Sequence, residues 1–321
     1  MSRVSMADVA AHAGVSAQTV SRVVNASPRV DPVTRARVEA AMAALGYRVH
    51  RAAQALRTGR TRTIGLVVST LASVGNSRML QAIAEAASAR DYALAIVTVA
   101  GSRDIADAFA RLREQGVDGA VVLNEATRLA RDSAPPAGLR LVVVDSPADD
   151  RFAIVQTDHA AGARAAVAHL LERGHPTVHH LAGPRSSFAA VERERGWQEA
   201  LADAGAPVAE AVRGDWTSAS GYAAGAALGA ASAVFVANDQ MALGLLRALA
   251  DAGRSVPDDV AVVGFDDVVD AAEYRPPLTT VRQDFDALGT RAVEVLVGLL
   301  EENAEVGRTE VPATLVVRAS S

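Results

Sequence analysis

The sequence predicts an α/β protein that carries a small all-α domain at its N-terminus. From Thr63 onwards, short runs of Val, Ile and Leu alternate with helical segments. This alternation is typical of a doubly wound parallel sheet whose strands are buried on both faces. The chain has 321 residues, half of them hydrophobic and only 4% aromatic, which is enough material for more than one core. Residues 1–48 instead show three short helical patterns.

The first two helical patterns, over residues 5–25, form a helix-turn-helix. Ser5 can cap the first helix, with Asp8 in its first turn. Gly14 stands where the chain must turn sharply, and Ser16 can cap the second helix. A helix, a tight turn with Gly and a second helix are the arrangement that places a helix in the major groove of DNA. A pair of purely structural helices is the alternative interpretation.

The second helix carries side chains suited to reading DNA on the face that does not enter the core. Val20, Val23 and Val24 recur at helical spacing and should face inwards, which leaves Gln18 and Arg22 outside. Gln and Arg pair bidentately with the edges of adenine and guanine. We therefore predict a recognition helix with the DNA-contacting residues Ser16, Ala17, Gln18, Thr19, Ser21, Arg22 and Asn25, in which Ala17 offers only an apolar contact.

A third helix and a connecting segment complete the N-terminal part. The third helix should begin at Pro32, because Pro is favoured in the first helical position, and stop at Gly46. Within residues 49–62, the segment 51–60 contains one large apolar side chain, Leu56, flanked by Arg51 and Arg57. This segment is too short to be a stable helix alone. A flexible linker with an incidental leucine is one interpretation of it.

The body should consist of two series of strands and helices. Strands are expected over residues 63–69, 93–99, 119–123, 141–145, 178–181, 234–237, 260–264 and 311–317. Helices are expected over residues 79–89, 105–115, 161–172, 189–204, 241–250 and 287–300.

Polar residues follow several of these strands, where ligands of open α/β sheets bind. Acids, an amide, an arginine and aromatic rings are a usual set for a sugar, because polar groups take its hydroxyls and rings stack on its C–H faces. Structural alternatives exist: Asp239 and Asp267 could be helix caps or turn formers, Trp216 could belong to the core, and Arg193 could form a surface ion pair with Glu192 or Glu194. The candidate ligand residues are Asp145, Arg193, Trp216, Asn238, Asp266, Gln283 and Phe285.

Composition and charge exclude other classes of function. There is no cysteine, so disulfides and thiolate metal sites are excluded. His179 and His180 are adjacent in an expected strand and point to opposite faces, and no catalytic, metal or cofactor motif is found. Residues 1–62 hold ten arginines against three acids, whereas the whole chain carries −5. The positive charge of residues 1–62 is suited to contact with the phosphates of DNA. Without a long apolar run or a signal core, we expect a cytoplasmic protein with no membrane contact.

Several strings identify the chain as similar to a known family. The segments Asp8-Val9-Ala10, Ala13-Gly14-Val15-Ser16 and 19–25 resemble the headpiece of the LacI/GalR family of bacterial repressors, and the similarity continues to Val317. In the body it is carried by residues 182–187, 214–216, 236–244 and 276–285.

The resemblance implies a two-lobed body like that of periplasmic binding proteins. It implies a headpiece over residues 1–48, a hinge helix or linker over 49–62 and an effector-binding and dimerisation domain over 63–321, with chain crossings near 157 and 283. It also implies that Leu56, beside Arg57, enters a minor-groove step, and that the seven candidate ligand residues form the effector site.

The function implied is a repressor of a sugar-utilisation operon. It would bind a palindromic double-stranded operator as a homodimer and be released by a sugar, for instance a galactoside. A corepressor-type regulator, a sugar-binding transport component and a sugar-acting enzyme remain alternatives. One departure leaves the operator preference open: Ala17 stands where a similar family member has a tyrosine. Others leave the particular sugar open: Thr157 stands where that member has an aromatic ring, Ala189 where it has a serine, and Gly75-Asn76 where it has Ala-Pro.

Overall fold

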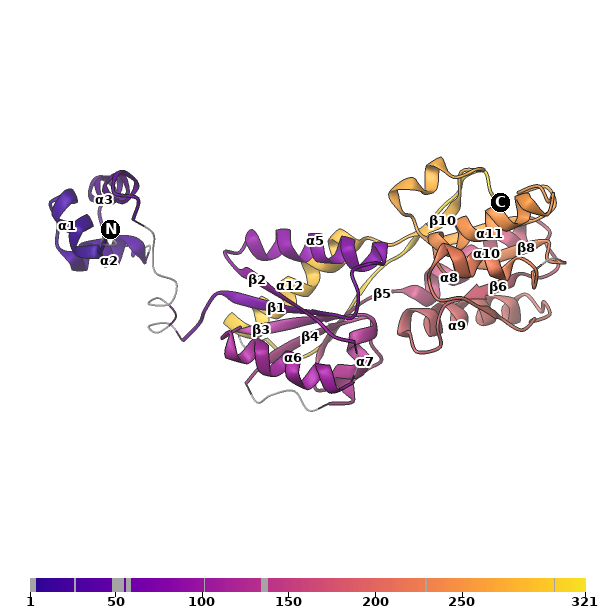
Figure 1. The fold of residues 1–321 in the computed structure, drawn as a ribbon, viewed down its shortest axis with the longest axis horizontal. Helices are drawn as coiled ribbons and strands as arrows, with labels where there is room; N and C mark the ends of the chain where they lie inside the picture. The colour runs from indigo at the N-terminus through magenta and orange to yellow at the C-terminus, as the bar shows by residue number, and fades with distance from the viewer. Residues whose placement is uncertain are drawn as a thin grey trace. The chain divides into compact units, whose positions relative to one another are not determined.

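The computed structural model describes residues 4–25, 27–47, 55, 59–100, 102–133, 138–228, 230–302 and 304–321. The chain forms two compact units, Met1–Thr61 and Arg62–Ser321 (Figure 1). Leu56 and Arg57 lie outside the described residues, as does most of the expected hinge segment.

Among its described residues, the N-terminal unit has the helices α1 (Met6–Ala13), α2 (Ala17–Val24) and α3 (Pro32–Ala44). Ser5 and Asp8 form a reciprocal capping box on α1, and Gly14 ends that helix in the left-handed conformation at φ 62°. Ser16 caps α2 through the backbone N–H of Thr19. Small buried side chains, among them Val9, Val20 and Val38, hold the three helices together.

Lobe 1 of the second unit is built on a six-stranded sheet in which all neighbours are parallel. Its strands, in the order β11-β5-β4-β3-β1-β2, are β11 (Arg308–Val311), β5 (Ala153–Thr157), β4 (Arg140–Val144), β3 (Gly119–Leu123), β1 (Thr63–Val68) and β2 (Ala93–Thr98). Side chains alternate between two cores, one under α5 (Val74–Ser88) and α12 (Phe285–Glu301), the other under α6 (Ser102–Glu114) and α7 (Glu125–Arg131).

Lobe 2 repeats this plan with one antiparallel edge strand. Its strands, in the order β12-β10-β9-β8-β6-β7, are β12 (Thr314–Val316), β10 (Thr279–Arg282), β9 (Ala261–Asp266), β8 (Ala233–Val236), β6 (His179–Ala182) and β7 (Val212–Arg213). The helices α8 (His159–Glu172) and α9 (Phe188–Asp203) cover one face. The other face carries α10 (Ser218–Ala224), α11 (Asp239–Asp251) and the 3₁₀ helix η1 (Val269–Glu273). The predicted fold class, an all-α headpiece followed by a two-lobed α/β body, is confirmed.

The expected single strand over residues 311–317 is wrong. The structure has two strands there, because β11 pairs with β5 in lobe 1 and β12 pairs with β10 in lobe 2. Pro312 lies between them, and a proline cannot continue a hydrogen-bonded ladder. The chain therefore passes between the lobes after β5, after β10 and again after β11. The short elements α7, β5 and α10 also had no counterpart in the sequence-based assignment.

Candidate functional site

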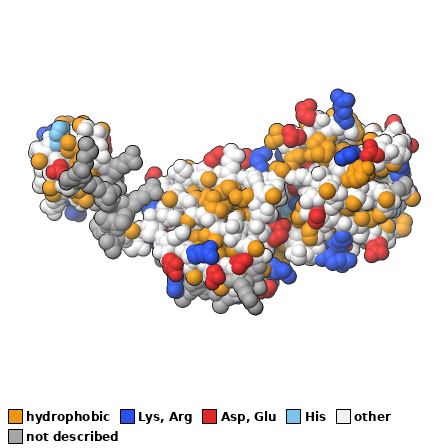
Figure 2. All heavy atoms as spheres, viewed as in Figure 1, with side chains coloured by type: hydrophobic (Ala, Val, Ile, Leu, Met, Phe, Trp, Pro, Cys, Tyr) orange, Lys and Arg blue, Asp and Glu red, His pale blue; other side chains and the backbone are white. Residues whose placement is uncertain are grey.

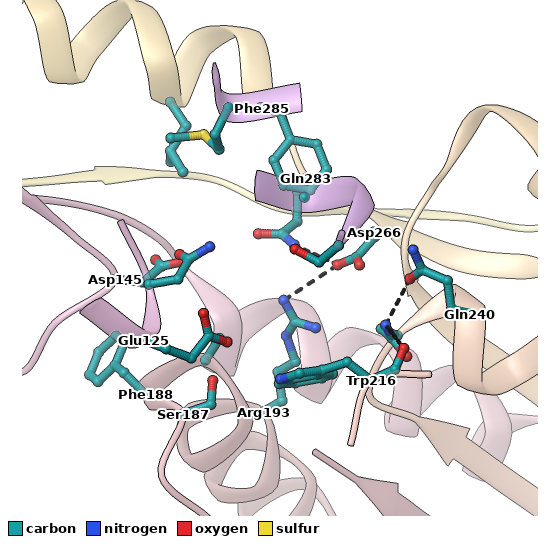
Figure 3. Close-up of a pocket in the computed structure, with 17 residues that line it drawn as sticks. Glu125, Asp145, Ser187, Phe188, Arg193, Trp216, Gln240, Asp266, Gln283 and Phe285 are labelled. Carbon is teal, nitrogen blue, oxygen red and sulfur yellow. Dashed lines mark hydrogen bonds and ion pairs between the residues drawn. The ribbon is translucent and has the colours of Figure 1, made fainter. Parts of the chain in front are cut away.

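A cavity of about 640 Å³, counted with the space that opens to solvent, lies between lobe 1 and lobe 2 (Figure 3). All seven ligand residues expected from the sequence line it: Asp145, Arg193, Trp216, Asn238, Asp266, Gln283 and Phe285. The structure thus brings together side chains that are up to 140 positions apart in the sequence.

Three of these residues have an unusual backbone conformation. Asp145 follows β4 with φ 57°, Asp266 ends β9 with φ 116°, and Trp216 has φ 76°. L-residues rarely adopt such angles, which cost free energy and persist mainly where the surroundings enforce them. All three residues also line the cavity.

Arg193 is the cation at the centre of the cavity. Its side chain extends from α9 and is 5% exposed, so the alternative of a surface ion pair is wrong. One guanidinium nitrogen lies 3.4 Å from Asp266 Oδ1, another donates to the Ala237 carbonyl oxygen, and the group stacks over the Phe265 ring at 3.9 Å. Burial lowers the pKa of Arg193, while the neighbouring carboxylates, Asp266 first, raise it.

Two acids near Arg193 are also buried: Asp266, which lines the cavity, and Asp239, which does not. Burial raises the pKa of Asp266, an effect that Arg193 opposes. Asp239 is not a helix cap as one interpretation had it, because Asn238 caps α11 and the Asp239 carboxylate accepts from the Thr280 hydroxyl and the Val268 N–H. Burial raises the pKa of Asp239 well above its ordinary value. Through these two hydrogen bonds, Asp239 connects α11 to Thr280 in β10 and to Val268 after β9.

Three aromatic residues line the described part of the cavity: Phe188, Trp216 and Phe285. Trp216 is half-buried and packs at the margin of the lobe 2 core as well as lining the cavity. Its ring lies against Gly183, where a Cβ would overlap the indole. Phe285 faces Gly75, where an added Cβ would come to 3.4 Å from the ring. Gly183 thus leaves room for the indole of Trp216, whereas an added Cβ at Gly75 would make only ordinary van der Waals contact with Phe285.

Glu125 and Ser187 also face the cavity, and the sequence-based interpretation missed them. Figure 3 shows the Glu125 carboxylate pointing into the cavity from lobe 1, on the side facing Arg193. The Ser69 hydroxyl donates to this carboxylate in a long hydrogen bond of 3.4 Å. The cavity lining thus holds three carboxylates, Glu125, Asp145 and Asp266, against one cation. Glu125 begins α7, an element without a clear helical pattern, so no sequence signal marked it.

In the N-terminal unit, the predicted recognition helix α2 leaves part of its surface exposed. Ser16, Ala17, Gln18 and Arg22 are exposed, and Thr19, Ser21 and Asn25 are half-buried. The last three are engaged locally: Thr19 Oγ1 lies 2.9 Å from Ser16 Oγ, and the Asn25 amide donates to the Ser21 carbonyl oxygen at 2.5 Å. A groove beside this helix adds two cations that sequence reasoning did not single out, Arg29 and Arg37.

The part of the chain that the structure describes contains no helix long and apolar enough to cross a bilayer. Among the same residues, no group of three His, Asp or Glu side chains could hold a metal ion.

Models of known protein families match parts of both compact units. Residues 5–49 match the model for bacterial regulatory proteins of the lacI family, and residues 167–321 match the periplasmic binding protein-like domain. The chain is 36% identical to the lactose operon repressor of Escherichia coli (strain K12), over 100% of this chain and 91% of the repressor. It is 37% identical to the HTH-type transcriptional regulator CelR of Thermobifida fusca, over 97% of this chain and 96% of CelR.

Solved structures give the same picture. The lac repressor dimer bound to operator and the anti-inducer ONPF superposes with a TM-score of 0.87 at 35% identity, covering 99% of both chains. A complex of the transcriptional regulator CelR with cellobiose superposes with a TM-score of 0.76 at 34% identity, covering 99% of this chain and 100% of that one.

Proposed function

Because the chain belongs to the LacI family of bacterial regulatory proteins, we propose that it is a transcriptional repressor that binds a palindromic operator as a homodimer and leaves it when a sugar binds. The observation that carries this proposal is the presence, in one chain, of an exposed helix face with Gln18 and Arg22 and of a cavity lined by the seven expected ligand residues. The first suits the edges of base pairs and the second suits a polyol.

For the operator, we assign base reading to Gln18 and Arg22, an apolar contact to Ala17, and contacts with the DNA backbone to Ser16, Thr19, Ser21 and Asn25. Arg29 and Arg37 add positive charge beside α2, which suits phosphates. The headpiece comprises residues 1–48, the hinge segment 49–62 and the effector-binding domain 63–321. In this proposal Leu56 enters a minor-groove step beside Arg57, and the protein works in the cytoplasm, where its operator lies.

Two headpieces are needed for a palindromic operator, because one recognition helix covers one half-site. The body offers a surface for pairing. Leu71, Val74 and Ile96 are large, exposed hydrophobic residues in or next to α5 and the edge strand β2 of lobe 1. Figure 2 shows hydrophobic side chains gathered on the visible face of this lobe. Burying such side chains against a second copy is favourable.

For the effector, we propose an uncharged sugar. Three carboxylates and one guanidinium leave the cavity with an excess of negative charge, so a phosphorylated or carboxylated sugar would be repelled. A neutral sugar offers many hydroxyl donors to the carboxylates, and its C–H faces fit the rings of Trp216 and Phe285.

The test is a release experiment with the full-length protein. The operator is first selected from random double-stranded DNA, and binding is then followed by fluorescence anisotropy while neutral sugars and their phosphates are titrated. We expect at least one neutral mono- or disaccharide to release the operator, and its phosphate to have no effect. Tighter DNA binding with sugar would identify a corepressor instead, and failure to select any DNA sequence would refute the repressor assignment.

A further inference from the structure

Six buried polar residues form a closed ring of contacts at the cavity, in which five contacts join side chains and one comes from the backbone N–H of Thr157. Their relative exposure is 8% or less in every case. Four of them are ligand residues proposed above, and two, Thr157 and His159, are not. The members in order are Asp145, His159, Arg193, Asp266, Gln283 and Thr157.

Two contacts of the ring join the lobes at the points where the chain crosses between them. His159, the first residue of α8 in lobe 2, places Nε2 at 3.0 Å from Oδ1 of Asp145 in lobe 1. The hydroxyl of Thr157, the last residue of β5 in lobe 1, donates to Oε1 of Gln283 at 2.8 Å. Gln283 in turn donates to Oδ1 of Asp266 at 2.6 Å. The ring therefore spans the first two crossings.

The donors and acceptors of the ring determine the state of the His159 imidazole. Arg193 Nε can only donate, and it faces His159 Nδ1 at 3.4 Å, so Nδ1 must be the acceptor. The ring proton then resides on Nε2, which faces the Asp145 carboxylate. A neutral imidazole with its proton on Nε2 satisfies both neighbours, whereas an imidazolium would place an N–H against the guanidinium.

The contact between His159 and Asp145 is close but poorly aligned. Although the two atoms are 3.0 Å apart, the buried Nε2 makes no hydrogen bond of good geometry with any residue that the structure describes. A buried N–H without a well-aligned acceptor costs free energy. A small rotation of the lobes would change the alignment of this contact, so its strength depends on how the lobes are oriented.

The ring also leaves one oxygen of each carboxylate for a ligand. Asp145 uses Oδ1 for the Thr157 N–H, and Asp266 uses Oδ1 for Gln283 and Arg193. Within the described ranges, neither Oδ2 accepts a hydrogen bond. One acceptor atom from each lobe is thereby held available at the cavity floor.

We propose that His159 is a positioning residue for the effector site: its Nε2–H holds the Asp145 carboxylate of lobe 1 in line with Arg193 of lobe 2, so that a sugar bridging both lobes finds its acceptors already oriented. The inference rests on the proposed function in taking Asp145 and Arg193 as effector ligands. The inference adds His159, which acts on the effector only through Asp145 and Arg193. Thr157, which stands where a similar family member has an aromatic ring, closes the other side of the ring in this chain.

Two substitutions test the contributions of the two nitrogen atoms of His159 separately. In His159→Gln, the side-chain amide can replace Nε2 as the donor towards Asp145. In His159→Asn, the shorter side chain can replace Nδ1 as the acceptor for Arg193 and leaves Asp145 without a donor. His169→Gln is the matched control, because His169 lies on the same helix and its Nε2 contacts Ser321 instead.

The measurement is binding of methyl β-galactoside and cellobiose to the full-length protein, followed through tryptophan fluorescence, with thermal unfolding of each variant alongside. We expect His159→Asn to weaken binding by about tenfold, because it removes the N–H that faces the Asp145 carboxylate at 3.0 Å and orients it, and His159→Gln to stay much closer to the wild type. Equal loss in both variants at equal thermal stability would overturn the positioning role.

If neither sugar binds the wild type, that result counts against the proposed effector class. A second measurement then tests the ring of contacts around His159 directly. In protein labelled with ¹⁵N at its seven histidines, the His159→Asn variant identifies the His159 signals by their loss. A neutral ring with Nδ1 unprotonated at pH 7 supports the ring of contacts. An imidazolium, or a proton on Nδ1, overturns it.

Discussion

Replacing Arg193 with lysine should separate sugar sensing from DNA binding. Lysine keeps a positive charge near Asp266, so the buried carboxylate is not left without a counter-charge, a loss that would destabilise the fold. It cannot reproduce the planar fork that reaches Asp266 and the Ala237 carbonyl oxygen, nor the stacking on Phe265 at 3.9 Å. We therefore expect the variant to repress normally and to respond poorly to sugar.

The size of the effect follows from the contacts that change. A bidentate donor pair to two sugar hydroxyls is replaced by a single ammonium, and each lost hydrogen bond to a charged group is worth about 1.5–3 kcal/mol. One such bond corresponds to roughly a 10- to 100-fold weaker sugar affinity. The sugar concentration that releases half of the operator should rise by the same factor, because a ligand shifts the equilibrium only by its differential affinity.

The assay is operator anisotropy as a function of sugar concentration, with direct sugar binding measured in parallel. Arg195→Lys is the matched control, because Arg195 lies two positions away on α9 and forms exposed ion pairs with Glu192 and Glu199. Normal sugar binding and normal release in the Arg193 variant would show that the cavity is not the effector site. Loss of operator binding without sugar would show that Arg193 serves the fold instead.

Three further predictions concern other parts of the chain. Arg22→Ala should cost about 1–3 kcal/mol on the selected operator and relax one base position, and an equal loss on random DNA would contradict base reading. Gly244→Ala should lower the free energy of unfolding by about 1–3 kcal/mol, measured by urea denaturation, because the new Cβ would overlap the Ser218 carbonyl oxygen of α10, whereas Gly307→Ala meets nothing and should be neutral. Burial lowers the pKa of His180 to about 4 from its ordinary 6.5, so the neutral folded form loses about 3 kcal/mol of stability as the pH falls from 6.5 to 4. The wild type should show this loss in denaturation curves and His180→Phe should not, and parallel curves for the two proteins would argue against it.

The sequence by itself determined the local structure and the chemistry of the site. Capping residues such as Ser16 and the helical spacing of small apolar residues were enough for the headpiece, because helix formation depends on neighbours within a few positions. Buried strands with polar residues at their ends were enough to predict an α/β body. The rule that ligands bind at the carboxyl ends of parallel strands then selected Asp145 and Asp266, both of which line the cavity.

Only the tertiary structure decided which side chains face one another across the lobes. Pro312 divides an apolar run between two sheets, and no periodicity in the sequence announces that a chain leaves one sheet for another. Glu125 and His159 have no distinguishing local pattern, yet one points into the cavity and the other connects Asp145 to Arg193. Their roles depend on sheet register and on where the chain crosses between lobes, and both are set by packing between residues far apart in the sequence.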